Sequence, residues 1–185
     1  MKIGLYSGAF DPPHVGHLLL MTYALATSKV DRIWMAPDET HPWGKKMTPY
    51  HHRFNMCREV CRELTGATCS LPRQNSKSSY TIDLIEFLQE LYPNDQFTLI
   101  LGADAWEARQ KWHRWEDLEK LVDFFVVGRQ GTEDACSVKM PNVSSSEVRR
   151  RIQAGESVDE LLPQSVVHYI KVANLYKLTT EEEKK

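Results

Sequence analysis

The sequence predicts an α/β fold, with a single doubly wound, mostly parallel sheet and a helical C-terminal part. Strand-like and helix-like segments alternate along the chain, as a parallel sheet with crossover helices requires. Two strand-like segments, 97–101 and 124–127, are almost wholly apolar, which is typical of strands covered on both faces. A length of 185 residues suits one domain with one well-buried core.

The first half of the chain supplies three strands and two helices. Its apolar periods predict, in order, a strand at 3–7, a helix at 15–29, a strand at 33–36, a helix at 49–64 and a strand at 67–71. Pro49 fits the first turn of the second helix, because its missing N–H would have no intrahelical partner there. A polar loop precedes that helix.

The second half continues the alternation and then becomes helical. A helix is predicted at 81–91, ended by Pro93, and two strands at 97–101 and 124–127. Ser144 or Ser145 suits the N-cap of a helix that runs through Ile152. Residues 179–185 form a charged segment without periodicity, which we expect to be a mobile tail beyond a domain of residues 1–178.

Composition excludes several classes of protein. Mean hydropathy is −0.46, and no apolar run approaches the roughly 20 residues of a membrane span. A net charge of −2 offers no basic surface for nucleic acid. The N-terminus opens into a strand without a signal-like apolar segment, so the cytoplasm is the expected location.

The four cysteines do not predict a metal site. Cys57, Cys61, Cys69 and Cys136 lack paired C-x-x-C spacing, and the first two lie four residues apart on a predicted helix, as packed residues do. We therefore expect reduced, inert thiols and no protein-bound metal.

Residues 7–17, between the first strand and the first helix, have the composition of a phosphate site. His14 and His17 are three residues apart and project from one helix face, beside first-turn N–H groups that attract anions. Gly8 and Gly16 would let a phosphate approach the backbone. The alternative is a tight turn with two surface histidines.

Two other segments have the composition of ligand sites. Ser144, Ser145 and Ser146 precede Arg149 by one helical turn, which combines hydroxyls with a guanidinium suited to phosphate; an ordinary N-cap with a surface arginine is the alternative. Gly102 and Asp104 follow the strand at 97–101, at the edge where open α/β sheets bind ligands. Asp104 could hold ribose hydroxyls or cap the following helix.

These segments carry a family resemblance. GAFDPPHVGH at 8–17 resembles the G-x-F-D-P-x-H-x-G-H signature of the HxGH nucleotidyltransferase superfamily, and VSSSEVR at 143–149 resembles its I-S-S-T-x-I-R signature. The segments at 79–83, 101–104, 111–112, 126–129, 161–163, 169–170 and 175–176 are similar to bacterial nicotinate mononucleotide adenylyltransferases. The resemblance covers nearly the whole chain and implies a Rossmann-like nucleotidyltransferase fold.

The resemblance also implies an activity: transfer of the adenylyl group of ATP to nicotinate mononucleotide, giving deamido-NAD and pyrophosphate in NAD biosynthesis. Magnesium would be bound through the ATP phosphates. Nicotinamide mononucleotide and phosphopantetheine are alternative acceptors, and a nucleotide-binding regulatory module without turnover is the alternative class. A homo-oligomer is possible.

Residue roles follow from the same resemblance. His14, His17 and Lys45 are the implied catalytic residues. The implied ATP-binding residues are Ser7, Gly8, Ala9, Phe10, His14, Gly16, His17, Gly102, Asp104, Ser144, Ser145 and Arg149. The implied mononucleotide-binding residues are Lys45, Arg53, Thr81 and Trp112, where Trp112 would stack on the pyridine ring while Trp106 and Trp115 pack.

The sequence departs from the family pattern at two places. Ser7-Gly8-Ala9 replaces Gly-Gly-Thr, where Ser7 could supply the lost polar contact. His41-Pro-Trp-Gly-Lys45-Lys46 replaces P-P-H-K, so that either lysine could reach the phosphates, and alignment of the prolines favours Lys45.

Overall fold

The fold is a five-stranded parallel sheet with helices on both faces. The computed structural model describes residues 1–27, 29–40, 44–69, 80–128 and 140–177. Over those residues the strands are β1 (Lys2–Gly8), β2 (Arg32–Pro37), β3 (Ala67–Cys69), β4 (Gln96–Gly102) and β5 (Asp123–Val127). Their order is β3-β2-β1-β4-β5, every neighbouring pair being parallel. The predicted fold class is confirmed.

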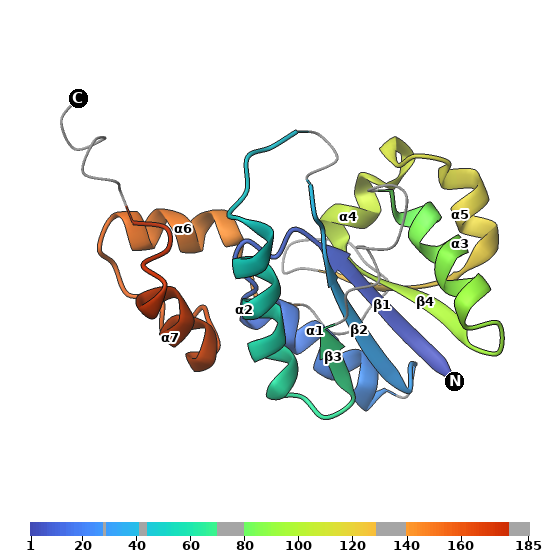
Figure 1. Ribbon diagram of the computed structural model, residues 1–185, viewed down its shortest axis with the longest axis horizontal. Coiled ribbons are helices and arrows are strands. Elements are labelled where there is room, and N and C mark those ends of the chain that lie inside the picture. The colour runs from blue at the N-terminus through green and yellow to red at the C-terminus, as the bar shows by residue number, and fades with distance from the viewer. Residues whose placement is uncertain (28, 41–43, 70–79, 129–139, 178–185) are drawn as a thin grey trace.

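Helices cover the sheet on two sides (Figure 1). In chain order they are α1 (Val15–Ala26), α2 (Tyr50–Arg62), α3 (Thr81–Leu91), α4 (Ala103–Glu107), the 3-10 helix η2 (Arg109–Lys111), α5 (Trp115–Leu121), α6 (Ser145–Gln153) and α7 (Gln164–Val172). One apolar cluster joins the sheet to α1, α2, α6 and α7, and a second joins its other face to α3 and α5. The C-terminal helices thus share a face with α1.

Strand order creates a natural ligand position. The chain runs from β1 outward to β2 and β3, and then returns to the other side of β1 for β4 and β5. Neighbouring strands β1 and β4 therefore lead to helices on opposite faces, and ligands bind at such a reversal, beyond the carboxyl ends of the strands. Gly8 and Gly102 end these two strands.

Most predicted elements are confirmed, with shifts at their ends. The helix expected at 81–91 has those limits as α3. The helix expected at 15–29 ends earlier, at Ala26; Thr27 is its C-cap, whose hydroxyl and N–H both bind the Tyr23 carbonyl, at 2.8 and 3.0 Å. The third strand ends at Cys69, and residues 70–71, like the tail at 179–185, lie outside the described residues.

Two further expectations can be compared with the described part of the chain. No helix there is long and apolar enough to cross a membrane. Cys57 and Cys61 are buried as predicted, and burial raises the pKa of Cys61 to about 12. Within the same residues no group of three or more His, Cys, Asp or Glu side chains could hold a metal ion. Cys136 lies outside them.

Candidate functional site

The turn after β1 is anchored by an aromatic residue in a left-handed conformation. Phe10 has φ of 47° and is only 3% exposed. Its ring meets Tyr6 and His17 edge-on, with centroids 5.2 and 5.0 Å apart. A side chain at positive φ is held there by its surroundings, so the packing of Phe10 sets the path of the chain from β1 into α1.

His14 and His17 lie against each other at the start of α1, as predicted. Their rings stack with centroids 3.6 Å apart and an interplanar angle of 22°. A Cβ on Gly16 would come within 3.1 Å of the His14 ring, so glycine at this position leaves room for that ring. His14 is buried and His17 is half-buried.

The protonation of His17 follows from its hydrogen bond. Its Nδ1 accepts the backbone N–H of His14 at 3.0 Å, so the proton of the neutral ring is on Nε2. The backbone therefore selects the tautomer in which Nε2–H is a donor. Such a donor can bind a phosphate oxygen without needing the charged imidazolium.

Two N–H groups in the first turn of α1 have hydrogen-bond partners within the protein. Val15 donates to the Leu161 carbonyl at 3.0 Å, and His17 donates to the His14 carbonyl at 2.9 Å. First-turn N–H groups were expected to attract anions, and these two already have carbonyl acceptors inside the protein. The two imidazoles consequently carry more of the proposed anion site than the helix terminus does.

The second signature segment contacts the first. The Ser145 hydroxyl donates to the Pro12 carbonyl at 2.8 Å, and Arg149 Nη1 donates to the Asp11 carbonyl at 2.5 Å. Ser144 is the N-cap, as predicted, and its Oγ accepts the Glu147 N–H at 3.2 Å. Residues more than 130 positions apart in the chain thus hold each other beside His14.

The neighbouring arginines have other partners. Arg150 pairs with Glu147 and Glu156 at 2.8 and 2.9 Å, and Arg151 pairs with Glu147 and Glu160. Hydrogen bonds from Arg150 and Arg151 lower the pKa of Glu147 to about 2. Arg149 is therefore the arginine of this run that reaches the signature turn.

Arg53 is buried and binds three backbone carbonyls. It is 1% exposed, and its guanidinium donates to the carbonyls of Thr48, Ala9 and Glu39 at 2.8, 2.8 and 3.2 Å. Arg53 thereby joins the signature turn to the loop before α2. Its contact with a mononucleotide stays a prediction.

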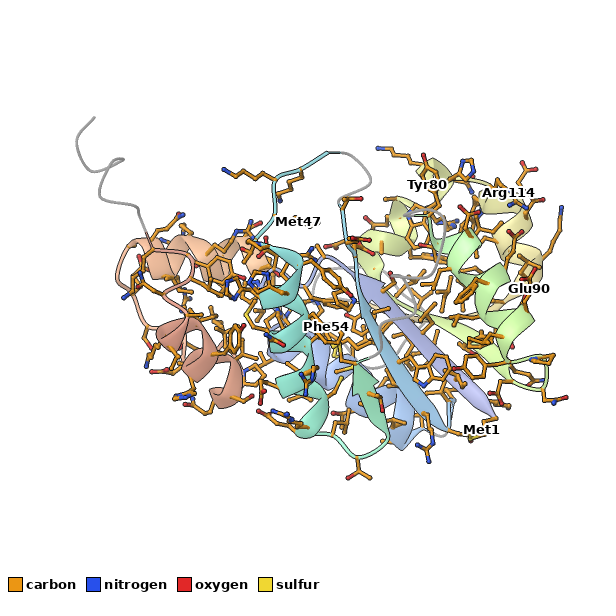
Figure 2. The ribbon with its side chains drawn as sticks, in the orientation of Figure 1. Met1, Met47, Phe54, Tyr80, Glu90 and Arg114 are labelled. Carbon is orange, nitrogen blue, oxygen red and sulfur yellow. The ribbon has the colours of Figure 1, made fainter. Side chains whose placement is uncertain are left out.

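That loop carries the two candidate lysines. Lys45 and Lys46 are both exposed, on the segment that leads through Met47 into α2 (Figure 2). Residues 41–43 of the departing motif lie outside the described part. Both lysines therefore remain candidates for a phosphate contact.

Packing within the protein does not require glycine at the ends of β1 and β4. A Cβ on Gly8 would meet Phe10 no closer than 3.4 Å, and one on Gly102 would meet nothing within 4 Å. Space at both positions is what the close approach of a ligand would use. Nearby, the Ser7 hydroxyl donates to Asp38 at 3.0 Å, and Asp104 is exposed in the first turn of α4.

Two of the predicted mononucleotide-binding residues lie on the face of the sheet opposite to α1. Thr81 is the first residue of α3, and Trp112 follows η2; both are half-buried. Trp112 meets Trp115 edge-on at 6.2 Å. Trp115 is 5% exposed and contacts Trp106 at 5.8 Å, which confirms that these two rings pack.

Sequence reasoning missed the partners of Asp11. The carboxylate is 7% exposed; its Oδ1 accepts the Tyr176 hydroxyl at 2.8 Å and its Oδ2 accepts the Thr48 N–H at 3.1 Å. Asp11 and Tyr176 both lie in the quoted motifs, but no spacing rule pairs residues so far apart. An aspartate directly before two prolines, between a strand and a helix, was the available signal for a structural carboxylate.

Comparisons with known proteins agree with this geometry. The cytidylyltransferase-like family model matches residues 5–151. A probable nicotinate-nucleotide adenylyltransferase of Anaeromyxobacter dehalogenans is 36% identical over 181 residues, covering 95% of this chain and 97% of the relative. The nicotinate-nucleotide adenylyltransferase of Bacillus subtilis is 32% identical over 186 residues, covering 95% and 98%.

Solved structures share the fold. Plasmodium falciparum nicotinic acid mononucleotide adenylyltransferase complexed with NaAD superposes with a TM-score of 0.82 at 22% identity, covering 95% of this chain and 97% of that one. A putative nicotinate-nucleotide adenylyltransferase from Vibrio parahaemolyticus has a TM-score of 0.75 at 20% identity, covering 96% of each chain.

Proposed function

Because the chain belongs to the cytidylyltransferase-like family and, within it, to the nicotinate-nucleotide adenylyltransferases, we propose that it transfers the adenylyl group of ATP to nicotinate mononucleotide. A phosphate oxygen of the mononucleotide attacks the α-phosphorus, and the bond to the β-phosphate breaks. The products are deamido-NAD and pyrophosphate. ATP enters as its magnesium complex, since the triphosphate is a hard oxygen ligand.

The stacked pair of His14 and His17 is the observation that carries the proposal. Adenylyl transfer needs donors where negative charge grows on the α-phosphate and on the departing pyrophosphate, rather than a protein nucleophile. The backbone bond to His17 Nδ1 supplies such a donor at Nε2. It is already oriented before ATP binds, so no reorganisation is needed during the reaction.

Other residues take roles according to where they lie. Arg149, fixed beside the signature turn by its bond to Asp11, adds charge for the triphosphate. Lys45 or Lys46 contributes a further cation from the loop after β2. The nucleoside part of ATP lies over Gly8, Gly102 and Asp104 at the ends of β1 and β4, where Ser7, Ala9, Phe10, Gly16, Ser144 and Ser145 complete the ATP side.

The acceptor occupies the side of α3 and η2. Thr81 lines the mononucleotide site, and Trp112 stacks on the pyridine ring, since its half-buried indole leaves part of the ring for a ligand. Nicotinamide mononucleotide and phosphopantetheine are the competing acceptors. A cytoplasmic location and a homo-oligomer are further parts of the proposal that remain predictions.

One experiment tests the function. The purified protein is incubated with Mg-ATP and, in parallel, with nicotinate mononucleotide, nicotinamide mononucleotide or phosphopantetheine, and pyrophosphate release is measured. We expect the highest kcat/KM with nicotinate mononucleotide and a sharp fall in the His17→Ala variant. ATP binding without pyrophosphate release for any acceptor would identify a regulatory module instead.

A further inference from the structure

The buried carboxylate of Asp11 joins three distant parts of the chain. The signature turn carries it, the Thr48 N–H comes from the lysine-bearing loop, and the Tyr176 hydroxyl comes from the segment after α7. Burial of a polar group costs free energy unless hydrogen bonds replace those it made to water. Tyr176 and Thr48 supply one donor to each oxygen.

The connection continues beyond Asp11. Thr48 offers its carbonyl to Arg53 Nε at 2.8 Å, and Arg53 also holds the carbonyls of Ala9 and Glu39. A continuous chain of hydrogen bonds therefore begins at Tyr176 and passes through Asp11 and Thr48 to Arg53. From Arg53 it reaches the carbonyls of Ala9 and Glu39. The backbone of the signature turn is held at two points, Ala9 and Asp11.

We propose that Tyr176 is a positioning residue for adenylyl transfer, which acts by holding the Asp11 carboxylate and through it the histidines and the lysine loop. The inference rests on the proposed function. Asp11 precedes His14 by two prolines, whose fixed φ angles transmit a shift of Asp11 to the helix start. Without the tyrosine hydroxyl, the carboxylate turns toward water and releases Thr48.

The backbone around Tyr176 supports this assignment. Asn174 and Tyr176 have φ of 51° and 65°, a conformation that costs free energy for residues other than glycine and persists only where contacts enforce it. The Leu175 N–H donates to the Ile170 carbonyl at 3.1 Å, which turns the chain back after α7. The strained turn directs the tyrosine side chain toward Asp11.

The hydroxyl is a donor throughout the usual assay range. Burial first, and the charge of Asp11 second, raise the pKa of Tyr176 well above its ordinary value. The phenol consequently stays protonated near neutral pH. The contact with Asp11 is then a charge-assisted hydrogen bond, which is stronger than a neutral one.

Tyr176→Phe tests the proposal, with Tyr169→Phe as the matched control. Tyr169 also has a bonded hydroxyl, 3.0 Å from His52 Nδ1 and 3.0 Å from Asn55 Nδ2, but it joins α7 to α2 away from the signature turn. Each change removes one oxygen and keeps the ring. We expect kcat/KM for ATP to fall about tenfold in Tyr176→Phe, the order set by one hydrogen bond to a charged group, and to stay near wild type in Tyr169→Phe.

A second measurement separates positioning from general stability. Amide exchange of the Thr48 N–H, followed by NMR, should accelerate in Tyr176→Phe and stay unchanged in Tyr169→Phe. Unchanged Thr48 exchange, or an equal loss of kcat/KM in both variants, overturns the proposal. If Tyr176→Phe did not fold, Asp11→Asn would be measured in its place, because this change weakens the side chain that accepts the tyrosine hydroxyl. Slow exchange of the Thr48 N–H in Asp11→Asn would also overturn the proposal.

Failure of the proposed function gives a different result. A wild-type protein that releases no pyrophosphate with any acceptor refutes adenylyl transfer but leaves the two structural readouts available. Calorimetric titration with Mg-ATP and Thr48 exchange would then be compared between wild type and Tyr176→Phe. A weaker ATP affinity with faster exchange supports the link from Tyr176 to the nucleotide site, and identical values refute it.

Discussion

Replacing His17 by alanine removes a donor to the reacting phosphate and should leave the protein folded. The imidazole stacks on His14 at 3.6 Å and meets Phe10 at 5.0 Å, two contacts of about 0.5–1.5 kcal/mol each. Its Nδ1 accepts one backbone N–H, a bond that contributes about 1 kcal/mol. Because a domain has roughly 5–15 kcal/mol of stability, a loss of about 2–4 kcal/mol leaves most molecules native.

The effect on the reaction is expected to be larger. A positioned donor to developing charge contributes about 2.7–4 kcal/mol to the transition state, so kcat should fall about 10²–10³-fold. Pyrophosphate release is measured below the Tm of the variant, with the exposed residue His51 changed to alanine as a control that should keep its kcat. A folded His17→Ala protein with nearly wild-type kcat would refute the role given to Nε2–H.

The remaining predictions concern other parts of the molecule. Arg149→Ala should raise KM for ATP and lower kcat, whereas Arg150→Ala should change neither, because its ion pairs are exposed; equal effects in steady-state kinetics would indicate a diffuse basic surface. Trp115→Ala should lower the free energy of unfolding by about 3–5 kcal/mol, since the indole is 5% exposed. Trp112→Ala should mainly weaken mononucleotide binding. A calorimetric loss of stability as large as that of Trp115→Ala, with unchanged mononucleotide affinity, would make Trp112 a packing residue. Burial raises the pKa of Cys61 from 9.0 to about 12, so the unfolded chain loses this proton first and stability should fall as pH rises above 9; a flat urea midpoint between pH 9 and 11 would contradict this.

Much of the fold could be predicted because its signals are local. An apolar run bounded by polar residues marks β4. The alternation of strands with helices predicts a parallel sheet, and β1 does pair in parallel with both β2 and β4. The segment between β4 and β5 could not be predicted in the same way. Its turns depend on Arg114 at φ of 53°, which is held by Glu86 and Asp117, and such tertiary pairs leave no periodicity.

In the candidate site, too, local features could be predicted from the sequence and tertiary contacts could not. His14, His17 and Ser144 have the positions expected from their spacing, because each acts within its own turn of helix. The carbonyl partners of Arg53 could not be predicted, since a guanidinium that binds carbonyls and one that binds a phosphate have the same appearance in a sequence. Whether three carbonyls surround it depends on where the loops at Ala9 and Glu39 lie, and this is a property of the folded chain.

The contact between Asp11 and Tyr176 has a consequence for the synthesis of the protein. The two residues are 165 positions apart, and chains grow at about 5–20 residues per second. The first signature turn is therefore made roughly 8–33 s before its last hydrogen-bond donor exists. A nascent chain that already contains β1 to β5 still has Asp11 without the tyrosine hydroxyl, so the positioning proposed for Tyr176 can begin only after residue 176 has been added.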